Sequence, residues 1–146
     1  MNDEWRTGRR VVYRLWAHIV LTPKYRRKVM TQRVTDQLGF VFAEVCERYG
    51  AELVEYNTDQ DHAHLLVSYP PKVALSNLVM GLKTNSSVRI RELGYEEVTR
   101  ALWGKHFWSP SYAVVSCGGA PLEIIKEYVR NQGKPNRPQG RPRTKR

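Results

Sequence analysis

Apolar and polar residues alternate along the first part of the chain and then change to a helical spacing. Residues 11–21 alternate as strand residues do, because successive side chains of a strand point to opposite faces. Pro23 ends this run, since proline cannot donate a hydrogen bond to a strand ladder. From Val34 to Tyr49 apolar residues recur every three or four positions, which predicts a helix that Gly50 terminates.

The rest of the chain continues as short strands and helices. Ser76 is predicted to cap a second helix, and Pro121 stands at the first position of a third. Residues 94–105 show no clear period and are expected to be irregular. The predicted strands are 11–21, 53–57, 61–67 and 107–116, the last of them interrupted or placed at the sheet edge at Pro110. The predicted helices are 34–49, 76 to just before Gly94, and 121–132.

This order of elements predicts a fold class. The order β-α-β-β-α-β-α is that of a ferredoxin-like or RRM-like α+β sandwich with a central antiparallel sheet and one added helix. Two helices are expected to cover one face of the sheet, and the other face is left for the third helix and a ligand. Residues 1–132 are predicted to form a single domain, and residues 133–146 a disordered basic tail.

The positive charge of the chain indicates which class of partner it can bind. Lys and Arg number 24 against 14 Asp and Glu, which gives a net charge of +10. Residues 24–28 form a cluster of cations around Tyr25. Clusters of this kind suit a polyanion, and an aromatic residue among the cations offers a surface on which unpaired bases stack. A solvated surface would explain the same charges. The residues expected to contact nucleic acid are Lys24, Tyr25, Arg26, Arg27, Lys83 and Arg89.

The sequence disfavours both a disulfide-stabilised secreted protein and a membrane protein. Cys46 and Cys117 are the only cysteines, which is no disulfide framework and fits the reducing cytoplasm. No run of 18 apolar residues is present, and we expect no contact with a membrane. The first residues resemble no secretory signal, so a cytoplasmic location is expected.

Two histidines in the third predicted strand suggest a metal site. His62 and His64 are two residues apart, so both project from one face of the strand together with Leu66. Two neighbouring imidazoles can chelate a divalent cation. The alternative is one core histidine beside one surface histidine. Asp61 could orient a ligand histidine through its free ring nitrogen, or it could simply be a turn residue.

The third predicted helix carries a candidate nucleophile. Tyr128 and Gln132 are four residues apart and therefore share one face of that helix. Should this face approach the histidine strand, Gln132 could offer a carbonyl oxygen to the cation and Tyr128 a nucleophilic hydroxyl. The alternative places Tyr128 in the core with Ile124. His18 shares its strand face with Trp16, where it could contact DNA or be a hydrogen-bonded structural residue.

Several blocks of residues resemble one protein family. The chain is similar, over roughly residues 13–132, to the small single-tyrosine transposases of the HUH class, the TnpA type of IS200-like insertion sequences. The histidine strand and the segment around Trp108 are distinctive, and the order and spacing of all the blocks make the resemblance specific. The blocks are His18–Val20, Pro23–Arg27, Asp61–Val67, Leu82–Ser87, Leu102–Gly104, Phe107–Tyr112 and Ile125–Gln132.

The resemblance implies a mechanism and partners. His62, His64 and Gln132 would hold a divalent metal, Mg²⁺ or Mn²⁺, and Tyr128 would attack a phosphate of single-stranded DNA to leave a 5′-phosphotyrosine. It implies subterminal DNA hairpins as the substrate, and a homodimer in which the tyrosine helix of one subunit can complete the site of the other. Gly118-Gly119 would be the hinge of that helix, or plain turn residues.

Two other functions remain open at this point. One is a non-catalytic module that binds single-stranded nucleic acid on the same sandwich. The other is a domesticated relative that processes chromosomal hairpins and does not move itself.

Overall fold

The computed structural model describes residues 5–102, 104, 106–117 and 122–132. Its order of elements contains the predicted β-α-β-β-α-β-α series. The elements are β1 (Arg6–Gly8), β2 (Val11–Tyr13), β3 (Trp16–Leu21), the 3₁₀ helix η1 (Lys24–Arg26), α1 (Gln32–Arg48), β4 (Glu52–Asp59), β5 (His62–Ser68), α2 (Leu75–Leu93), α3 (Glu96–Ala101), β6 (Ala113–Ser116) and α4 (Leu122–Gln132).

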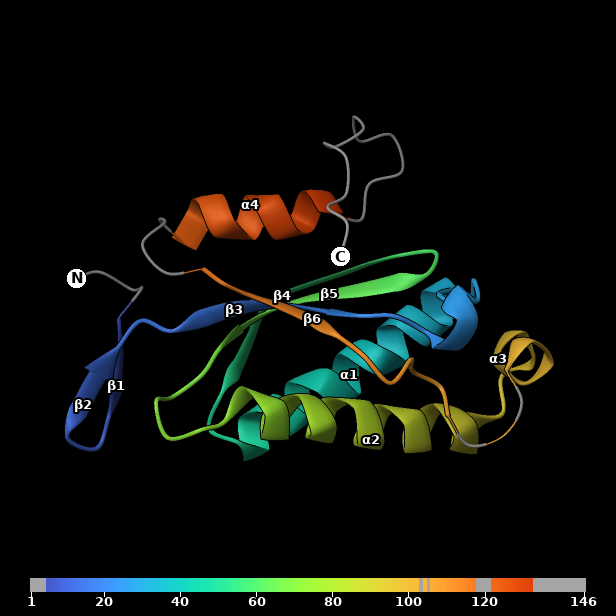
Figure 1. The fold of residues 1–146 in the computed structure, drawn as a ribbon, viewed down its shortest axis with the longest axis horizontal. Helices are drawn as coiled ribbons and strands as arrows, with labels where there is room; N and C mark the ends of the chain where they lie inside the picture. Colours follow the sequence, from blue (N-terminus) through green and yellow to red (C-terminus); the bar gives the residue numbers. More distant parts are fainter. Residues whose placement is uncertain (1–4, 103, 105, 118–121, 133–146) are drawn as a thin grey trace.

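The main sheet has four strands in the order β4-β5-β3-β6, and every neighbouring pair is antiparallel. Helices α1 and α2 lie side by side under one face of this sheet, and α4 lies across the opposite face (Figure 1). The predicted α+β sandwich with a central antiparallel sheet is therefore confirmed. The two central strands, β3 and β5, carry the histidines.

The face of the sheet toward α1 and α2 forms the main core. Alternate residues of the central strands are fully buried there, and each large aliphatic side chain contributes about 1.5–3 kcal/mol by leaving water. The opposite residues of the same strands point toward α4. The strand residues of the main core are Ala17, Ile19, Leu21, Ala63, Leu65 and Val67, and they pack on Val34, Leu38, Phe42, Leu78, Leu82 and Ile90 of the helices.

Helix α4 is attached to the sheet by a small second core and by polar contacts. Ile125 and Val129 pack on Trp16 and Leu66. Their spacing of four residues puts them on one face of the helix. At the C-terminal end of α4, Arg130 pairs with Glu55 of β4 through Nε and Oε2, 3.2 Å apart. The last helix therefore covers the face of the sheet from which His62 and His64 project.

Some local predictions were wrong. The predicted strand 11–21 is interrupted, because residues 11–13 pair with β1 in a separate hairpin and only Trp16–Leu21 joins the main sheet. Helix α2 begins at Leu75, one residue before Ser76, and its N-cap residue Ala74 has no side-chain hydrogen bond.

One prediction near residue 100 was also wrong. The segment expected to be irregular contains α3, whose Glu97 is held by Arg33 and Thr31 of the α1 N-terminus. The predicted strand 107–116 is interrupted around Pro110, as expected, and only Ala113–Ser116 pairs with β3, as an edge strand of the sheet. Trp108 instead forms an isolated bridge with Pro23.

Other expectations fall on residues outside the described part of the chain. These are the Gly118-Gly119 hinge, Pro121 and the basic tail of residues 133–146. Among the helices that the structure does describe, none has the length and hydropathy needed to cross a bilayer.

Candidate metal and nucleophile site

His62 and His64 project from the same face of β5, as the alternation along the strand predicts. Their rings stack with an interplanar angle of 23° and centroids 6.0 Å apart. His64 is buried, whereas His62 lies at the strand end and is partly exposed. Because β5 is hydrogen-bonded on both sides, to β3 and to β4, the backbone that carries the two imidazoles is firmly held.

Two carboxylates from the β4–β5 turn approach His62. Asp61 Oδ1 lies 2.7 Å from His62 Nδ1, and Asp59 Oδ1 lies 3.4 Å from the same nitrogen. Contact with Asp59 and the negative charges of both carboxylates raise the pKa of His62, although burial opposes this. With Nδ1 engaged in this way, Nε2 is the nitrogen of His62 that remains for a cation.

Asp59 also connects the two histidines. Its Oδ2 lies 3.5 Å from His64 Nε2, at the outer limit of a hydrogen bond. Burial raises the pKa of Asp59, but its contacts with His62 and His64 outweigh this and hold the pKa well below the usual range. Asp59 is therefore a carboxylate at neutral pH.

The donor set fits a divalent cation. His64 Nε2 is buried, and the approach of Asp59 Oδ2 to 3.5 Å gives it no well-formed hydrogen bond, which is costly unless another group, such as a metal, satisfies this nitrogen. Ligand atoms of Asp59, Asp61 and His62 lie within 4.8 Å of one another. Imidazole nitrogens together with carboxylate oxygens suit Mn²⁺, and the oxygens also suit Mg²⁺.

A third histidine links this pair to α4. His18 Nε2 lies 3.3 Å from His64 Nδ1, and its ring meets the ring of Tyr128 edge-on, with centroids 5.6 Å apart. Burial, reinforced by His64, lowers the pKa of His18 to about 4, so it is neutral at pH 7. Tyr128 is thus placed beside the histidines of its own chain.

Tyr128 is not a core residue. Its side chain is 56% exposed, while the neighbouring Ile125 and Val129 supply the buried face of α4. This disfavours the purely structural interpretation, in which Tyr128 and Ile124 would pack inward, because Ile124 is also 60% exposed. Gln132 ends α4 one turn further on and is half-buried, and its role as a ligand stays a prediction.

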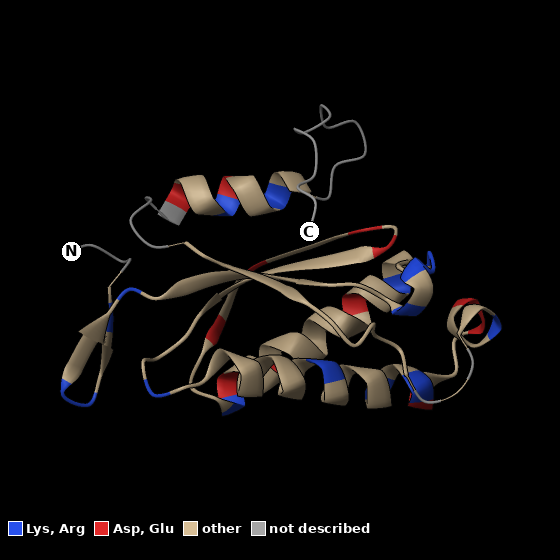
Figure 2. Cartoon of the chain, viewed as in Figure 1, with Lys and Arg blue, Asp and Glu red and all other residues tan. Residues whose placement is uncertain are grey.

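The basic cluster at η1 is connected to the metal-site residues. Arg26 pairs with Asp61 Oδ2 at 3.1 Å, and the other oxygen of that carboxylate contacts His62. Tyr25 is 71% exposed, and the cations of Lys24 and Arg27 lie 5.5 Å and 5.8 Å from its ring centroid. Figure 2 shows basic positions in the η1 segment close to the acidic β4–β5 turn, in agreement with the Arg26–Asp61 pair.

The η1 turn has an unusual backbone. Tyr25 and Arg26 have φ values of 60° and 52°, which side chains with a Cβ rarely adopt. Hydrogen bonds hold the turn, from the Arg26 N–H to the Pro23 carbonyl and from the Lys24 N–H to the Phe107 carbonyl. Consecutive residues in this region are often found at functional sites, where the surrounding structure over-determines them.

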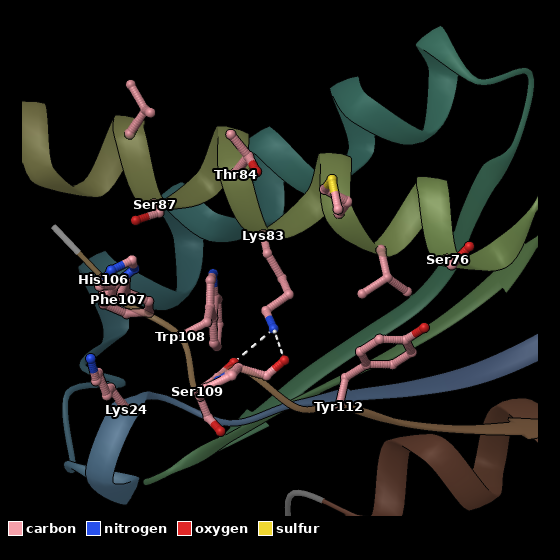
Figure 3. Close-up of a pocket in the computed structure, with 14 residues that line it drawn as sticks. Lys24, Ser76, Lys83, Thr84, Ser87, His106, Phe107, Trp108, Ser109 and Tyr112 are labelled. Carbon is pink, nitrogen blue, oxygen red and sulfur yellow. Dashed lines mark hydrogen bonds between the residues drawn. The ribbon is translucent and has the colours of Figure 1, made fainter.

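Lys83 and Arg89 lie on α2, away from the histidine face. Lys83 Nζ donates to the carbonyls of Ser109 and Pro110, at 2.7 Å and 3.1 Å, in a groove of about 620 Å³ (Figure 3). Lys83 is thus only half-exposed, because it satisfies carbonyls of a segment that runs beside α2. Arg89 is exposed.

The sequence reasoning missed Asp59 as a site residue and underrated Asp61. Asp59 pairs directly with His62 across the antiparallel β4–β5 ladder. Residues opposite each other in such a ladder share a face of the sheet, so the short turn between these strands was the available signal. Asp61 is both a turn residue and the partner of His62. His18 is a hydrogen-bonded buried residue, as the interpretation that favoured a structural role had it.

Comparison with known proteins gives a consistent result. Residues 11–132 match the family model described as "Transposase IS200 like". The ISDra2 transposase TnpA of Deinococcus radiodurans is 31% identical over 129 residues, which is 88% of this chain and 91% of the relative. The IS200 transposase of Salmonella typhimurium is 29% identical over 115 residues, which is 79% of this chain and 74% of the relative.

Solved structures agree on the fold. A crystal structure of a Deinococcus radiodurans R1 protein assigned as a transposase superposes with a TM-score of 0.69 and 30% identity, and covers 88% of this chain and 98% of its own. A REP-associated tyrosine transposase bound to a REP hairpin superposes with a TM-score of 0.57 and 12% identity, and covers 85% of this chain and 67% of its own. At that low identity the second likeness concerns the fold alone.

Proposed function

The chain belongs to the IS200-like transposase family and is a DNA transposase, and from this premise we propose that it cuts and rejoins single-stranded DNA with Tyr128 as the nucleophile. The observation that carries the proposal is the position of Tyr128. Its ring rests against His18, which is hydrogen-bonded to His64, so an exposed phenol lies beside paired histidines and two carboxylates. The family resemblance found in the sequence is thereby confirmed, whereas the roles of the single residues are part of this proposal.

The chemistry is a transesterification. Tyr128 Oη attacks the phosphorus of a DNA phosphodiester and loses its proton, the bond from phosphorus to the 3′ oxygen breaks, and that oxygen takes up a proton. The products are a 5′-phosphotyrosine and a free 3′-OH. Attack by another 3′-OH on the phosphotyrosine reverses these steps and releases Tyr128, so that no nucleotide cofactor is consumed.

We assign the divalent cation to His62, His64 and Gln132, with Asp59 as a further candidate ligand. The cation, Mg²⁺ or Mn²⁺, would neutralise the scissile phosphate and polarise its P–O bond when bound. Asp61 holds His62 at 2.7 Å, and Asp59 lies within 3.5 Å of both histidines, so these carboxylates orient the imidazoles. Helix α4 keeps Tyr128 at the edge of the site, where DNA can reach it.

The DNA is proposed to reach the site along the η1 turn. Arg26 is paired with Asp61 beside the histidines, and the exposed ring of Tyr25 lies between two cations. Phosphates would contact Lys24, Arg26 and Arg27, and an unpaired base would stack on Tyr25. Lys83 and Arg89, on the opposite side of the sheet, would bind a more distant part of the same DNA.

The substrate is proposed to be single-stranded DNA with subterminal hairpins, and the active form a homodimer with shared sites. The structural relative bound to a REP hairpin supports a nucleic-acid partner for this fold. Strand β6 is an edge of the sheet, and its Val114 and Val115 are 40% and 59% exposed, which suits pairing with a second copy. Light scattering of the purified chain tests the dimer.

The proposed activity is tested by trapping the covalent product. Labelled single strands that cover the two DNA flanks of the gene are incubated with the protein and Mn²⁺, Mg²⁺ or EDTA, and then run on a denaturing gel. We expect a protein–DNA band that needs the cation, is absent with double-stranded DNA, and disappears in Tyr128→Phe while DNA binding persists. Tyr95→Phe, on the remote helix α3 side, is the matched control and should keep the band.

Two outcomes would overturn the proposal. Adduct formation by Tyr128→Phe would remove the nucleophile assignment. Tight binding of these strands without an adduct under any cation would instead indicate a non-catalytic module.

A further inference from the structure

His18 stands where three elements of the fold meet. It comes from β3, its Nε2 lies 3.3 Å from Nδ1 of His64 on β5, and its ring is edge-on to Tyr128 of α4, with an interplanar angle of 87°. It is 5% exposed. Within the described part of the chain, His18 contacts both the inner histidine, His64, and the tyrosine, so one imidazole connects the two halves of the site.

The contact between His18 and His64 has a direction. When two neutral imidazoles share one hydrogen bond, one nitrogen donates and the other accepts. A nitrogen that binds a cation must be unprotonated, which places the proton of that ring on its other nitrogen. For a cation-bound His64, Nε2 is the atom that faces the site beside Asp59, so Nδ1 would carry the proton and donate it to His18 Nε2, whereas without a cation the Asp59 carboxylate, 3.5 Å from Nε2, favours the proton on Nε2.

We propose that His18 is a positioning residue that fixes His64 as the Nδ1–H tautomer and seats the ring of Tyr128 beside it. This inference rests on the proposed roles of His64 as a metal ligand and Tyr128 as the nucleophile. The orientation of a ligand and that of the attacking phenol are then set by the same side chain, and a displacement of His18 moves both.

The surroundings of position 18 explain why it carries a histidine and not a carboxylate. The other ligand histidine, His62, is held by the carboxylate of Asp61 at the rim of the site, where the charge is partly hydrated. His18 lies under α4, beside the buried Trp16, where an uncompensated carboxylate would be costly. A neutral imidazole accepts the same hydrogen bond without a charge and also offers a flat edge to Tyr128.

Two substitutions separate the two roles. His18→Gln can place an amide oxygen near the position of Nε2 and so keeps an acceptor for His64, but it lacks the ring that Tyr128 contacts. His18→Phe keeps the ring and lacks the acceptor. His106→Phe, at an exposed histidine outside the site, is the matched control.

The first measurement is the tautomer of His64 in the metal-free protein, read from long-range ¹H–¹⁵N correlations. Asp59, 3.5 Å from Nε2, competes for this proton, so we expect a larger share of the Nδ1–H form in the wild type, in His18→Gln and in His106→Phe than in His18→Phe. An equal share of the Nδ1–H form in His18→Phe and in the wild type would overturn the proposal. Because this experiment uses neither metal nor DNA, its result is independent of whether the chain cuts DNA.

The second measurement is Mn²⁺ affinity by calorimetry, with the rate of adduct formation beside it. His18→Phe should bind Mn²⁺ roughly ten- to a hundredfold more weakly, as is typical when the partner of a ligand histidine is lost, and His18→Gln should stay within about threefold of the wild type. His18→Gln should nevertheless form the adduct at least roughly tenfold more slowly, because small misplacements of a reacting group are costly.

Each outcome is informative. Wild-type Mn²⁺ affinity and tautomer in a folded His18→Phe would refute the ligand-positioning role, and a wild-type adduct rate in His18→Gln would refute the seat for Tyr128. Should His18→Phe not fold, as judged by circular dichroism, His18→Leu, which also lacks an acceptor, takes its place in both measurements. A correct tautomer without any adduct would count against the proposed function and leave the positioning of His64 intact.

Discussion

The side-chain amide of Asn57 on β4 donates a hydrogen bond of 3.0 Å to the main-chain carbonyl of Val129 on α4. The same Nδ2 also donates to the carbonyl of Arg130. The last four carbonyls of a helix have no partner within it, so a side chain from the sheet caps this helix from outside. Asn57 is paired with His64 across the ladder, which makes it a direct link between the histidine strand and the helix that carries Tyr128.

Asn57→Ala should therefore loosen α4 selectively. Loss of these hydrogen bonds is expected to cost about 1–3 kcal/mol of docking stability, since two carbonyls lose their donor. Amide hydrogen exchange should accelerate in α4, with little change in α1 and α2, which belong to the main core. Asn77→Ala, at an exposed position of α2, is the control. Unchanged exchange in α4 would show that the apolar contacts of Ile125 and Val129 suffice.

Asp61→Ala should weaken metal binding without unfolding the protein. Asp61 holds His62 Nδ1 at 2.7 Å, and a ligand histidine that loses its partner usually loses roughly ten- to a hundredfold in metal affinity. Titration with Mn²⁺ by calorimetry measures this, with Asp36→Ala on the exposed side of α1 for comparison. Equal affinity in Asp61→Ala and the wild type would mean that Asp59 alone orients His62.

The pairing of Glu97 with Arg33 predicts an acid-sensitive contact. The hydrogen bonds from Arg33, with a further one from Thr31, lower the pKa of Glu97 from 4.5 to about 2. A carboxyl whose pKa is lower in the folded state stabilises the protein above its unfolded pKa, and the contribution is lost as the pH falls from about 4.5 through about 2. Above pH 5 the contribution is fully present.

Glu97→Gln should accordingly flatten the loss of stability in acid. Urea midpoints measured between pH 6 and pH 3 should fall less steeply for this variant than for the wild type. Glu96→Gln, which also removes one carboxylate, is the control and should fall as steeply as the wild type. Glu96 is the suitable comparison because its pair with Arg100 is long, at 3.6 Å, and largely exposed. Parallel curves for Glu97→Gln and the wild type would exclude this linkage.

Ser86 supports the packing of Trp108. The indole N–H of Trp108 donates to Ser86 Oγ at 2.9 Å, and Ser86 is fully buried. Ser86→Ala leaves the indole nitrogen without its acceptor and should lower the free energy of unfolding by about 1–3 kcal/mol. Ser76→Ala, which removes no cap hydrogen bond, should change it by less than about 0.5 kcal/mol. A drop in Ser76→Ala as large as that in Ser86→Ala would contradict both assignments.

Local patterns sufficed for the parts of the site that lie within one element. The alternation in β5 placed His62 and His64 on one face, and the spacing of four put Tyr128 and Gln132 on one face of the predicted helix. Partners across elements were harder to predict. His18 meets His64 only because the β3–β5 register pairs Val20 with His64, which leaves His18 as a diagonal neighbour, and nothing in the sequence fixes that register by itself.

The wrong elements have a common cause in contacts between distant residues. Residues 96–101 form α3 because Glu97 reaches Arg33 and Thr31, 64 and 66 positions away in the chain. Residues 107–112 leave the sheet, and their carbonyls at Ser109 and Pro110 bind Lys83 of α2. Hydrophobic periodicity indicates which side of a segment is buried, but it does not identify the distant polar group that binds the segment.

The seven residues of β5 serve two separate purposes: one face carries the histidines, and the other packs in the main core. Exchange of a side chain on the histidine face leaves the packing of Ala63, Leu65 and Val67 undisturbed, so descendants can lose or retune their chemistry and keep their shape. Deletion of one residue within the strand reverses the faces of the residues on one side of the deletion, so that residues of the histidine face enter the core and core residues turn outward. Inactive copies of such a mobile element that arose by substitution on the histidine face would therefore still fold. Copies with a deletion in β5 would not fold.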